Sequence, residues 1–329
     1  MINNKLQVNF NIERDIMDNT FVHGIHHITA FSGDVNENLT FYTKTLGLRL
    51  VKKSVNQDAP DIYHLFFADA NGSPGTDLTF FPFPNISKNK DGYGLASEVT
   101  FAIPQNSYAF WKSRLMEHDV DEFQEEMRFG EKVLSFRDPH GLRLALTELD
   151  GPKEDVVPWE KSTVPVENQI RGFHTVRLKL HTLTPTVQLM TQLMGFREVG
   201  TDGIWTRFES GKGGSGTFAD LGSFPDEPKG RWGSGGIHHV AWRTKDRELE
   251  AELRKKVAAF GLQPSPIIDR FWFESVYFQE PNGILFELAT DGPGFERDEK
   301  LDHLGEELIL PPWLESKREQ IEAALPKIH

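Results

Sequence analysis

Apolar residues along the chain follow two spacings, one typical of short strands and the other of amphipathic helices. An apolar stretch at residues 24–31, opened by a glycine, predicts a strand. Residues 35–46 then place apolar side chains at helical spacing, with Asp34 as the expected N-cap and Gly47 as the residue that ends the helix. Short strands are expected at 48–55, 62–68 and 76–81. The first predicted unit therefore runs strand, helix and three strands.

The same order of elements recurs three more times, within residues 98–148, 172–221 and 237–289. A unit of about 60 to 80 residues that repeats by pattern predicts a modular fold. We therefore expect an α+β fold of four βαβββ modules. The expected divisions are an N-terminal extension (1–20), a domain with modules one and two (21–160), a domain with modules three and four (161–292) and a tail (293–329). One helix is expected in the tail at 313–324, with Leu314, Ile321 and Leu325 as its packing side.

Two histidine doublets stand at matching places in modules one and four. The sequence Gly-Ile-His-His occurs at 24–27 and again at 236–239, a separation of 239 − 27 = 212 residues. Strand side chains alternate between the two faces of a sheet. Val240 and Trp242 share one apolar face, which leaves His239 on the other face, and the same reasoning applies to His27. Both histidines are expected to point to the concave side of the sheet if helices cover the apolar side.

A single carboxylate interrupts the last strand of module four. Residues 284–289 are apolar except for Glu287, and an ionised side chain among such neighbours needs a charge partner or a metal. A salt bridge to an arginine is the structural alternative. Two repeat-related histidines and a buried glutamate favour a 2-His-1-carboxylate site, which is typical of non-haem Fe(II). If this prediction is right, module one pairs with module four, and module two with module three.

The repeats provide an internal comparison for this set of residues. Counting from the turn before the last strand places Thr79, Ala145 and Asp220 at the position of Glu287 in modules one, two and three. The first strands of modules two and three offer Glu98 and Thr175 where the other two modules have His27 and His239. A complete His/His/Glu set is therefore predicted only between modules one and four.

Composition excludes several classes of protein. The 329 residues carry a net charge of −13, and no basic stripe is present to neutralise phosphates, which argues against a nucleic-acid binder. There are no cysteines, so disulfides, thiolate metal sites and cysteine nucleophiles are excluded. The chain contains no run of about 18 apolar residues, so the sequence predicts no membrane span. We expect a cytoplasmic protein. The sequence is compatible with a homo-oligomer but does not specify one.

Three motifs resemble one known family. Gly-Ile-His-His-Ile-Thr at 24–29, Gly-Ile-His-His-Val at 236–240 and Pro-Asn-Gly-Ile-Leu-Phe-Glu-Leu at 281–288 resemble ring-cleaving dioxygenases of the hydroquinone type, in the vicinal oxygen chelate superfamily. The resemblance covers nearly the whole chain, including Leu-Pro-Pro-Trp-Leu-Glu at 310–315. It implies two half-barrel domains, with Fe(II) held by His27, His239 and Glu287 and Mn(II) as the alternative ion. It also implies O2 as co-substrate and a small aromatic diol as substrate.

The resemblance further implies roles for residues beside the ligands. Substrate contacts are implied for His26, Thr29, His238, Arg270 and Tyr277, and catalytic roles for His238, Arg270 and Tyr277. From the residues alone, Arg270 is equally well explained as a surface or ion-pairing residue, and Tyr277 as a core aromatic residue with a hydrogen-bonded hydroxyl.

The remaining histidines have no partner pattern. Seven of them are interpreted as surface or local hydrogen-bonding residues: His23, His64, His118, His140, His181, His303 and His329; His174 stands beside Thr175 on the first strand of module three.

Two other functions use the same fold. A glyoxalase-like isomerase or thiol transferase would bind Zn, Ni or Mn, and such relatives generally use a second carboxylate from a last strand. Thr79 stands at that place in module one, which favours the three-ligand dioxygenase. A metal-free small-molecule-binding protein is the other alternative, and the presence of all three ligand types speaks against it.

Overall fold

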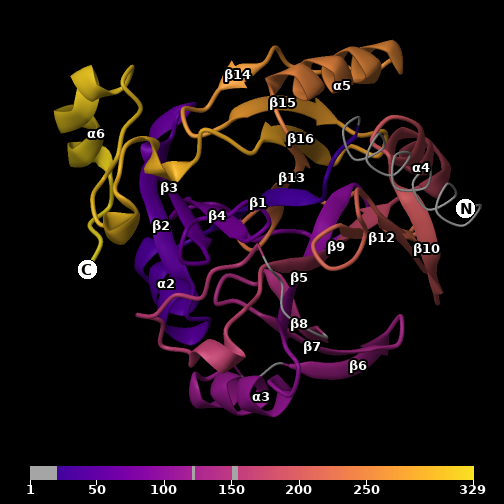
Figure 1. Ribbon diagram of the computed structural model, residues 1–329, viewed down its shortest axis with the longest axis horizontal. Coiled ribbons are helices and arrows are strands. Elements are labelled where there is room, and N and C mark those ends of the chain that lie inside the picture. Colours follow the sequence, from indigo (N-terminus) through magenta and orange to yellow (C-terminus); the bar gives the residue numbers. More distant parts are fainter. Residues whose placement is uncertain (1–20, 121–122, 150–154) are drawn as a thin grey trace, which may run out of the picture.

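The computed structural model describes residues 21–120, 123–149 and 155–329, so the predicted extension at 1–20 lies outside the described residues. Four βαβββ modules are present in these ranges, which confirms the predicted fold class (Figure 1). Module one comprises β1 (Ile25–Ser32), α2 (Val35–Thr40), β2 (Arg49–Asn56), β3 (Ala59–Ala68) and β4 (Asp77–Pro82). Module two comprises β5 (Leu95–Pro104), α3 (Tyr108–Glu117), β6 (Gln124–Arg128), β7 (Glu131–Arg137) and β8 (Arg143–Leu149).

The second half of the chain repeats this order and adds the tail. Module three comprises β9 (Phe173–Leu180), α4 (Leu183–Gln192), β10 (Arg197–Asp202), β11 (Trp205–Glu209) and β12 (Phe218–Ser223). Module four comprises β13 (Ile237–Thr244), α5 (Arg247–Ala259), β14 (Ile268–Asp269), β15 (Glu274–Gln279) and β16 (Leu285–Thr290). The tail ends in α6 (Arg318–Ala324). None of the helices in the described ranges is long and apolar enough to span a bilayer.

The modules combine into two curled sheets of eight strands. The first sheet has the order β14-β15-β16-β13-β1-β4-β3-β2, and the second has the order β10-β11-β12-β9-β5-β8-β7-β6. Antiparallel pairing of β1 with β13 joins modules one and four, and antiparallel pairing of β5 with β9 joins modules two and three. The predicted pairing of modules is confirmed. The domain boundary at residue 160 stays a prediction, and each sheet takes strands from both sides of it.

Alternation along the central strands separates an apolar face from a polar one. Ile28, Val240 and Trp242 are fully buried in the main hydrophobic cluster, together with Leu249 and Leu253 of α5. The helix α5 lies along β15 and β16 on this side of the first sheet (Figure 1). Burial of each such side chain contributes roughly 1.5–3 kcal/mol to folding. The opposite, concave face carries polar side chains together with a second, smaller apolar cluster that includes Phe66, Trp272 and Phe273.

Three elements differ from the sequence prediction. The strand β6 was not predicted, because its sequence Gln-Glu-Glu-Met-Arg shows no apolar alternation; it lies at a sheet edge with its first four residues exposed and Arg128 buried. The predicted helix 35–46 is α-helical only to Thr40 and continues as a π-helical turn over Phe41–Thr45. The tail helix begins at Arg318 rather than 313. Its expected packing residues Leu314, Ile321 and Leu325 are buried, as predicted.

The tail covers one edge of the first sheet. In Figure 1, α6 lies beside β2 and β3, and the backbone of Leu308 forms a bridge with Lys53. Further inside, the fully buried ammonium of Lys52 contacts Asp298 at 2.7 Å and also pairs with Glu299. These contacts attach residues 295–304 to β2.

A carboxyl group on α5 is buried against the first sheet without a hydrogen-bond partner in the described part of the chain. Glu250 of α5 is 0 % exposed, and neither of its carboxyl oxygens has a hydrogen-bond partner in the described part of the chain. Burial, reinforced by the negative charge of Glu287, raises the pKa of Glu250 to about 8. The folded protein therefore keeps this carboxyl protonated at neutral pH, whereas the unfolded chain ionises it above its ordinary value of 4.5.

We expect Glu250→Met to raise the free energy of unfolding by about 2–4 kcal/mol at pH 8. The gain grows between pH 4.5 and 8, because only the unfolded wild-type chain releases this proton in that window. Urea denaturation of the metal-free protein at pH 5 and pH 8 measures the difference. Glu252→Met, on the exposed face of the same helix, is the control. An equal gain at both pH values would contradict the assignment.

Candidate metal centre

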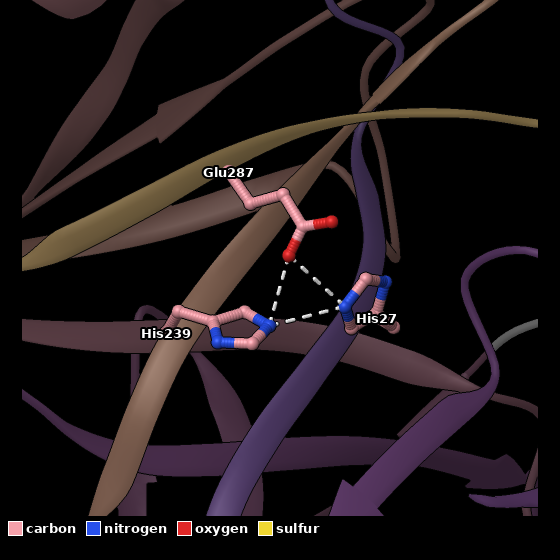
Figure 2. Close-up of side chains that lie close together, drawn as sticks. All are labelled: His27, His239 and Glu287. Carbon is pink, nitrogen blue, oxygen red and sulfur yellow. Dashed lines mark hydrogen bonds and ion pairs between the residues drawn. The ribbon is translucent and has the colours of Figure 1, made fainter. Parts of the chain in front are cut away.

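Three neighbouring strands bring His27, His239 and Glu287 together on the concave face of the first sheet. His27 lies on β1, His239 on β13 and Glu287 on β16, and these strands are adjacent in the order β16-β13-β1. The Nε2 atoms of the two histidines are 3.1 Å apart. The Oε2 atom of Glu287 lies 2.9 Å from Nε2 of His239 and 3.3 Å from Nε2 of His27. Figure 2 shows the three side chains pointing toward one point.

The spacing of these atoms fits a metal ion. Ligand atoms at about 2.1 Å from an ion, placed at right angles to one another, are separated by about 3.0 Å. The three observed separations lie around this value. All three residues are buried, and they form the one group of three or more such side chains in the described ranges that could hold an ion. The donor set therefore fits a cation bound on one triangular face.

Glu287 is held as a carboxylate. Its Oε1 accepts a hydrogen bond of 2.5 Å from Ser275, whereas Oε2 makes no hydrogen bond of acceptable geometry despite being buried. Burial opposes ionisation, but the two imidazoles outweigh it and hold the pKa of Glu287 well below its usual range. No arginine pairs with Glu287 in the described part of the chain, so the structural alternative of an arginine salt bridge is absent there.

Each proposed ligand histidine is supported by the histidine before it. Nδ1 of His26 lies 2.9 Å from Nδ1 of His27, and Nδ1 of His238 lies 2.8 Å from Nδ1 of His239. A histidine that binds a metal through Nε2 carries its proton on Nδ1, so with a metal in place His27 and His239 would be the donors in these two bonds. Burial, followed by the neighbouring histidine, lowers the pKa of His26 and of His238 to about 3. Both supporting rings are therefore neutral acceptors at physiological pH.

The two supporting histidines differ in what else they contact. The ring of His26 also makes a hydrogen bond to the backbone of Thr290, which uses its remaining nitrogen. For His238, the described residues provide no partner for Nε2, and the ring lies on the wall of a cavity among Phe31, Phe81 and Trp232. His26 therefore does not line this cavity, although it borders a separate one of about 170 Å³, whereas His238 can contact a ligand here.

A cavity of about 360 Å³ opens above the histidine and glutamate cluster. His27 and His239 lie at its floor, and Phe66, Trp272 and Phe273 provide aromatic walls. Such a volume is at the small end of ligand pockets and suits a single substituted ring. The aromatic walls exclude water from the atoms that would surround a bound ion.

Arg270 and Tyr277 form a polar side of this cavity. Nε of Arg270 donates to the Tyr277 hydroxyl at 3.3 Å, and a terminal nitrogen of Arg270 binds Asp58 of the β2–β3 turn at 3.0 Å. Burial and the carboxylate of Glu287 raise the pKa of Tyr277, so its hydroxyl stays protonated. Burial alone would lower the pKa of Arg270. Tyr277 and Asp58 raise this pKa by more than burial lowers it, so the guanidinium stays charged.

The structure thus separates the predicted substrate residues into two groups. His238, Arg270 and Tyr277 line the cavity. His26 lies behind His27, and Thr29 is fully buried with its hydroxyl 2.7 Å from that of Thr79. A residue without a predicted role, His64 of β3, lies on the cavity wall. Residues 62–68 around it are otherwise apolar or aromatic, and the repeats offer no partner for it, so the sequence alone does not distinguish it from a locally hydrogen-bonded strand histidine.

Strand register confirms the comparison of the four modules. In each module, the first strand pairs in parallel with the last strand. The residue two places after the position of His27 or His239 on the first strand then lies opposite the position of Glu287 on the last strand. These pairs are Thr29–Thr79, Thr100–Ala145, Arg177–Asp220 and Ala241–Glu287. In the second sheet, Glu98 pairs with Arg128, and Asp220 pairs with Arg207. Ion-paired residues therefore occupy two of the three positions that correspond to the His/His/Glu cluster, and Thr175 occupies the third.

Comparison with known proteins agrees with this geometry. Residues 24–146 match the family model described as Glyoxalase/Bleomycin resistance protein/Dioxygenase superfamily. The chain is 42% identical over 313 residues to the "Putative ring-cleaving dioxygenase MhqA" of Bacillus subtilis (strain 168), a match that covers 93% of this chain and 99% of the relative. The chain belongs to the vicinal oxygen chelate superfamily. The fold and family expected from the sequence are confirmed.

Two further relatives narrow the place of the chain within the superfamily. The chlorohydroquinone/hydroquinone 1,2-dioxygenase of Sphingobium indicum is 34% identical over 308 residues, covering 91% of this chain and 95% of that protein. A crystal structure described as a putative dioxygenase from Bacillus subtilis superposes with a TM-score of 0.88 at 38% identity, covering 94% of this chain and 98% of that chain. Close relatives of this vicinal oxygen chelate protein are therefore named as ring-cleaving dioxygenases.

Proposed function

We propose that the protein is an Fe(II)-dependent dioxygenase that uses O2 to open the ring of a hydroquinone or a related aromatic diol. The observation that carries this proposal is the His27/His239/Glu287 cluster at the floor of a single-ring cavity. Two histidines and one carboxylate leave coordination positions open and are typical of Fe(II) oxygenases. Mn(II) accepts the same ligands and is the alternative ion. The names of the relatives support the same reaction class.

A bound iron would supply Lewis acidity and a path for electrons between the diol and O2. The chain's own residues have separate tasks. Arg270 places a fixed positive charge at the cavity wall, where it stabilises a phenolate and the negative charge that develops during oxidation. Tyr277 receives a hydrogen bond from Arg270 and keeps its own proton to donate to the substrate.

His238 is the proposed proton carrier. It is neutral at physiological pH because burial and His239 lower its pKa to about 3. The ring lines the cavity, and its Nε2–H can donate a hydrogen bond to a substrate hydroxyl. His26 and Thr29, which do not line the cavity, are proposed to position other residues. His26 fixes the ring of His27, and Thr29 holds Thr79.

Two observations favour this function over its alternatives. The position in module one that would supply a fourth, carboxylate ligand for an isomerase or thiol transferase holds Thr79, which bonds to Thr29. The converging atoms of the three ligand residues disfavour a metal-free binding protein, because an orphaned carboxylate oxygen is costly to bury without a cation.

Oxygen uptake by the protein, loaded anaerobically with Fe(II), tests the proposal. We expect uptake of one O2 per molecule of methylhydroquinone, with loss of the aromatic absorbance and incorporation of both atoms of ¹⁸O2 into the product. Reactions with catechol and without a diol are run in parallel. Absence of uptake with every diol, together with turnover of a glutathione hemithioacetal, would replace the dioxygenase by the isomerase.

A further inference from the structure

The second sheet has a concave face of its own, to which the proposed reaction gives no task. Figure 1 shows this sheet curling from β10 round to β6. The backbone N–H of Phe129, between β6 and β7, donates to the carboxylate of Asp202 on β10 at 2.7 Å and so ties the two edges of the sheet together. A cavity of about 680 Å³ opens on this face, and its wall includes residues of β5, β6, β7 and β9. Its volume lies within the range of ligand pockets.

Arg177 of β9 lies in the wall of this cavity. It stands opposite Asp220 of β12, and this pair corresponds to Ala241 and Glu287 in the first sheet. The Arg177 side chain is only 11 % exposed. Its guanidinium lies over the indole of Trp205, with the guanidinium carbon 4.5 Å from the ring centroid. A buried cation is therefore held in place at the centre of the second sheet, beside the position that holds a proposed metal ligand in the first.

The guanidinium of Arg177 is short of hydrogen-bond acceptors. Its Nε is buried and makes no hydrogen bond, and its contacts with Glu98 and Asp220 are ion pairs of 4.0 and 3.7 Å. Its two terminal nitrogens also lack a hydrogen-bond partner among the described residues, and protein atoms do not enclose them. Burial lowers the pKa of Arg177 by more than the nearby carboxylates raise it. A guanidinium nevertheless stays charged in proteins, so this charge needs an acceptor from outside the chain.

The other buried cations on this face are closely paired. Arg128 forms ion pairs with two carboxylates, one of which is Glu98. Lys179 likewise pairs with two carboxylates. Asp220, the second carboxylate near Arg177, accepts two hydrogen bonds from Arg207, at 2.7 and 3.1 Å. The carboxylates that could neutralise Arg177 are therefore engaged by cations that lie closer to them.

Apolar side chains stand beside Arg177 in the same cavity. Trp205 and Phe224 contact each other, with ring centroids 5.4 Å apart, and both line the cavity. Ile204 also lines it and is 58 % exposed, which is unusual for a large aliphatic side chain. A ligand that binds Arg177 can therefore place an apolar group against this wall.

We propose that the cavity of the second sheet is a further binding site, for a small organic molecule that carries one carboxylate on an apolar body. The two terminal nitrogens of Arg177 present parallel N–H groups that match the two oxygens of a carboxylate. A phosphate dianion would bring a second negative charge toward Glu98 and Asp220, where no other unpaired buried cation lines the described part of the cavity. The site does not depend on the metal centre, so failure of the dioxygenase would leave this inference standing.

Calorimetric titration of the full-length, metal-free protein with benzoate tests the inference. We expect one molecule to bind per chain. Benzyl alcohol has the same ring without the charge and should bind at least about 10-fold more weakly, as for hydrogen bonds to a charged group. Acetate lacks the apolar body and should also bind more weakly than benzoate. Inorganic phosphate is titrated as the competing class of anion.

Variants of two arginines assign the site. Arg177→Leu should weaken benzoate binding by about 10-fold or more, because it removes both donors. Arg177→Lys keeps the charge without the fork and should give an intermediate affinity. Arg270→Leu removes the cation from the cavity of the first sheet and should leave the affinity for benzoate unchanged. Circular dichroism verifies the folding of each variant, and Arg177 has no side-chain hydrogen bond in the described structure whose loss would unfold the chain.

Crystals of the wild-type protein grown with 4-bromobenzoate locate the ligand without any substitution. We expect anomalous bromine signal beside Trp205, with the carboxylate on Arg177. Bromine found only in the cavity of the first sheet would overturn the inference. So would an affinity that Arg270→Leu lowers and Arg177→Leu does not, equal affinities for benzoate and benzyl alcohol, or phosphate that binds more tightly than benzoate.

Discussion

Replacing Glu287 with glutamine is expected to abolish iron retention and to lower oxygen uptake by about three orders of magnitude or more. The amide removes the negative charge from a set of otherwise neutral ligands, and Oε2 of Glu287 is the atom that faces both histidines. Metal content after gel filtration reports retention, and an oxygen electrode reports activity with methylhydroquinone.

Asp220→Asn is the matched control for this substitution. Asp220 is buried on β12 at the position that corresponds to Glu287, but its partner is Arg207. We expect this variant to keep the iron content of wild type, although the loss of the ion pair lowers its stability. Iron bound by Glu287→Gln at the stoichiometry of wild type would show that the metal centre lies elsewhere.

Lys52→Met is expected to lower the free energy of unfolding by about 3–5 kcal/mol. Its ammonium is fully buried and neutralises Asp298 and Glu299, which are themselves mostly buried. It also lies 5.3 Å from the ring centroid of Trp272, whose indole nitrogen donates to Asp298 at 3.0 Å. Removal of the cation leaves two carboxylates uncompensated beside a wall of the cavity. Urea denaturation at pH 7 measures the loss.

Lys53→Met separates this effect from the general loss of a lysine. The neighbouring side chain donates to the carbonyl of Glu306 in an exposed position. A change below about 1 kcal/mol is expected for such a surface substitution. Equal losses in the two variants would show that the buried ion pairs contribute little.

The fold and the convergence of His27, His239 and Glu287 could be predicted because they depend on local patterns. The repeated order of strands and helix identifies the modules, and alternation assigns His27 and His239 to the concave face. Strand register then confirmed the comparison that selects Glu287 over Thr79 and Asp220. Each of these steps uses residues within one module at a time, where sequence spacing determines which side chains share a face.

The residues that could not be predicted depend on contacts between distant segments. The ring of His64 is held at the cavity by Thr79 and Phe81, which lie on the neighbouring strand β4. The contribution of Lys52 to the free energy of unfolding depends on acidic residues about 246 positions later in the chain. The edge strand β6 has exposed polar residues on both faces. The periodicity of the sequence does not predict contacts between such distant residues, because these residues meet only after the sheets have assembled.

The pairing of β1 with β13 also sets the order of events during synthesis. The first and last of the three proposed ligands are 287 − 27 = 260 residues apart, so His27 leaves the ribosome long before Glu287 is synthesised. At about 5–20 residues per second, the interval is roughly 13–50 s. During this time β1 lacks the neighbour that will complete its sheet. Loading of the proposed metal centre must therefore follow the synthesis of a nearly complete chain, and a truncated product that stops before β16 lacks Glu287, one of the three proposed ligands.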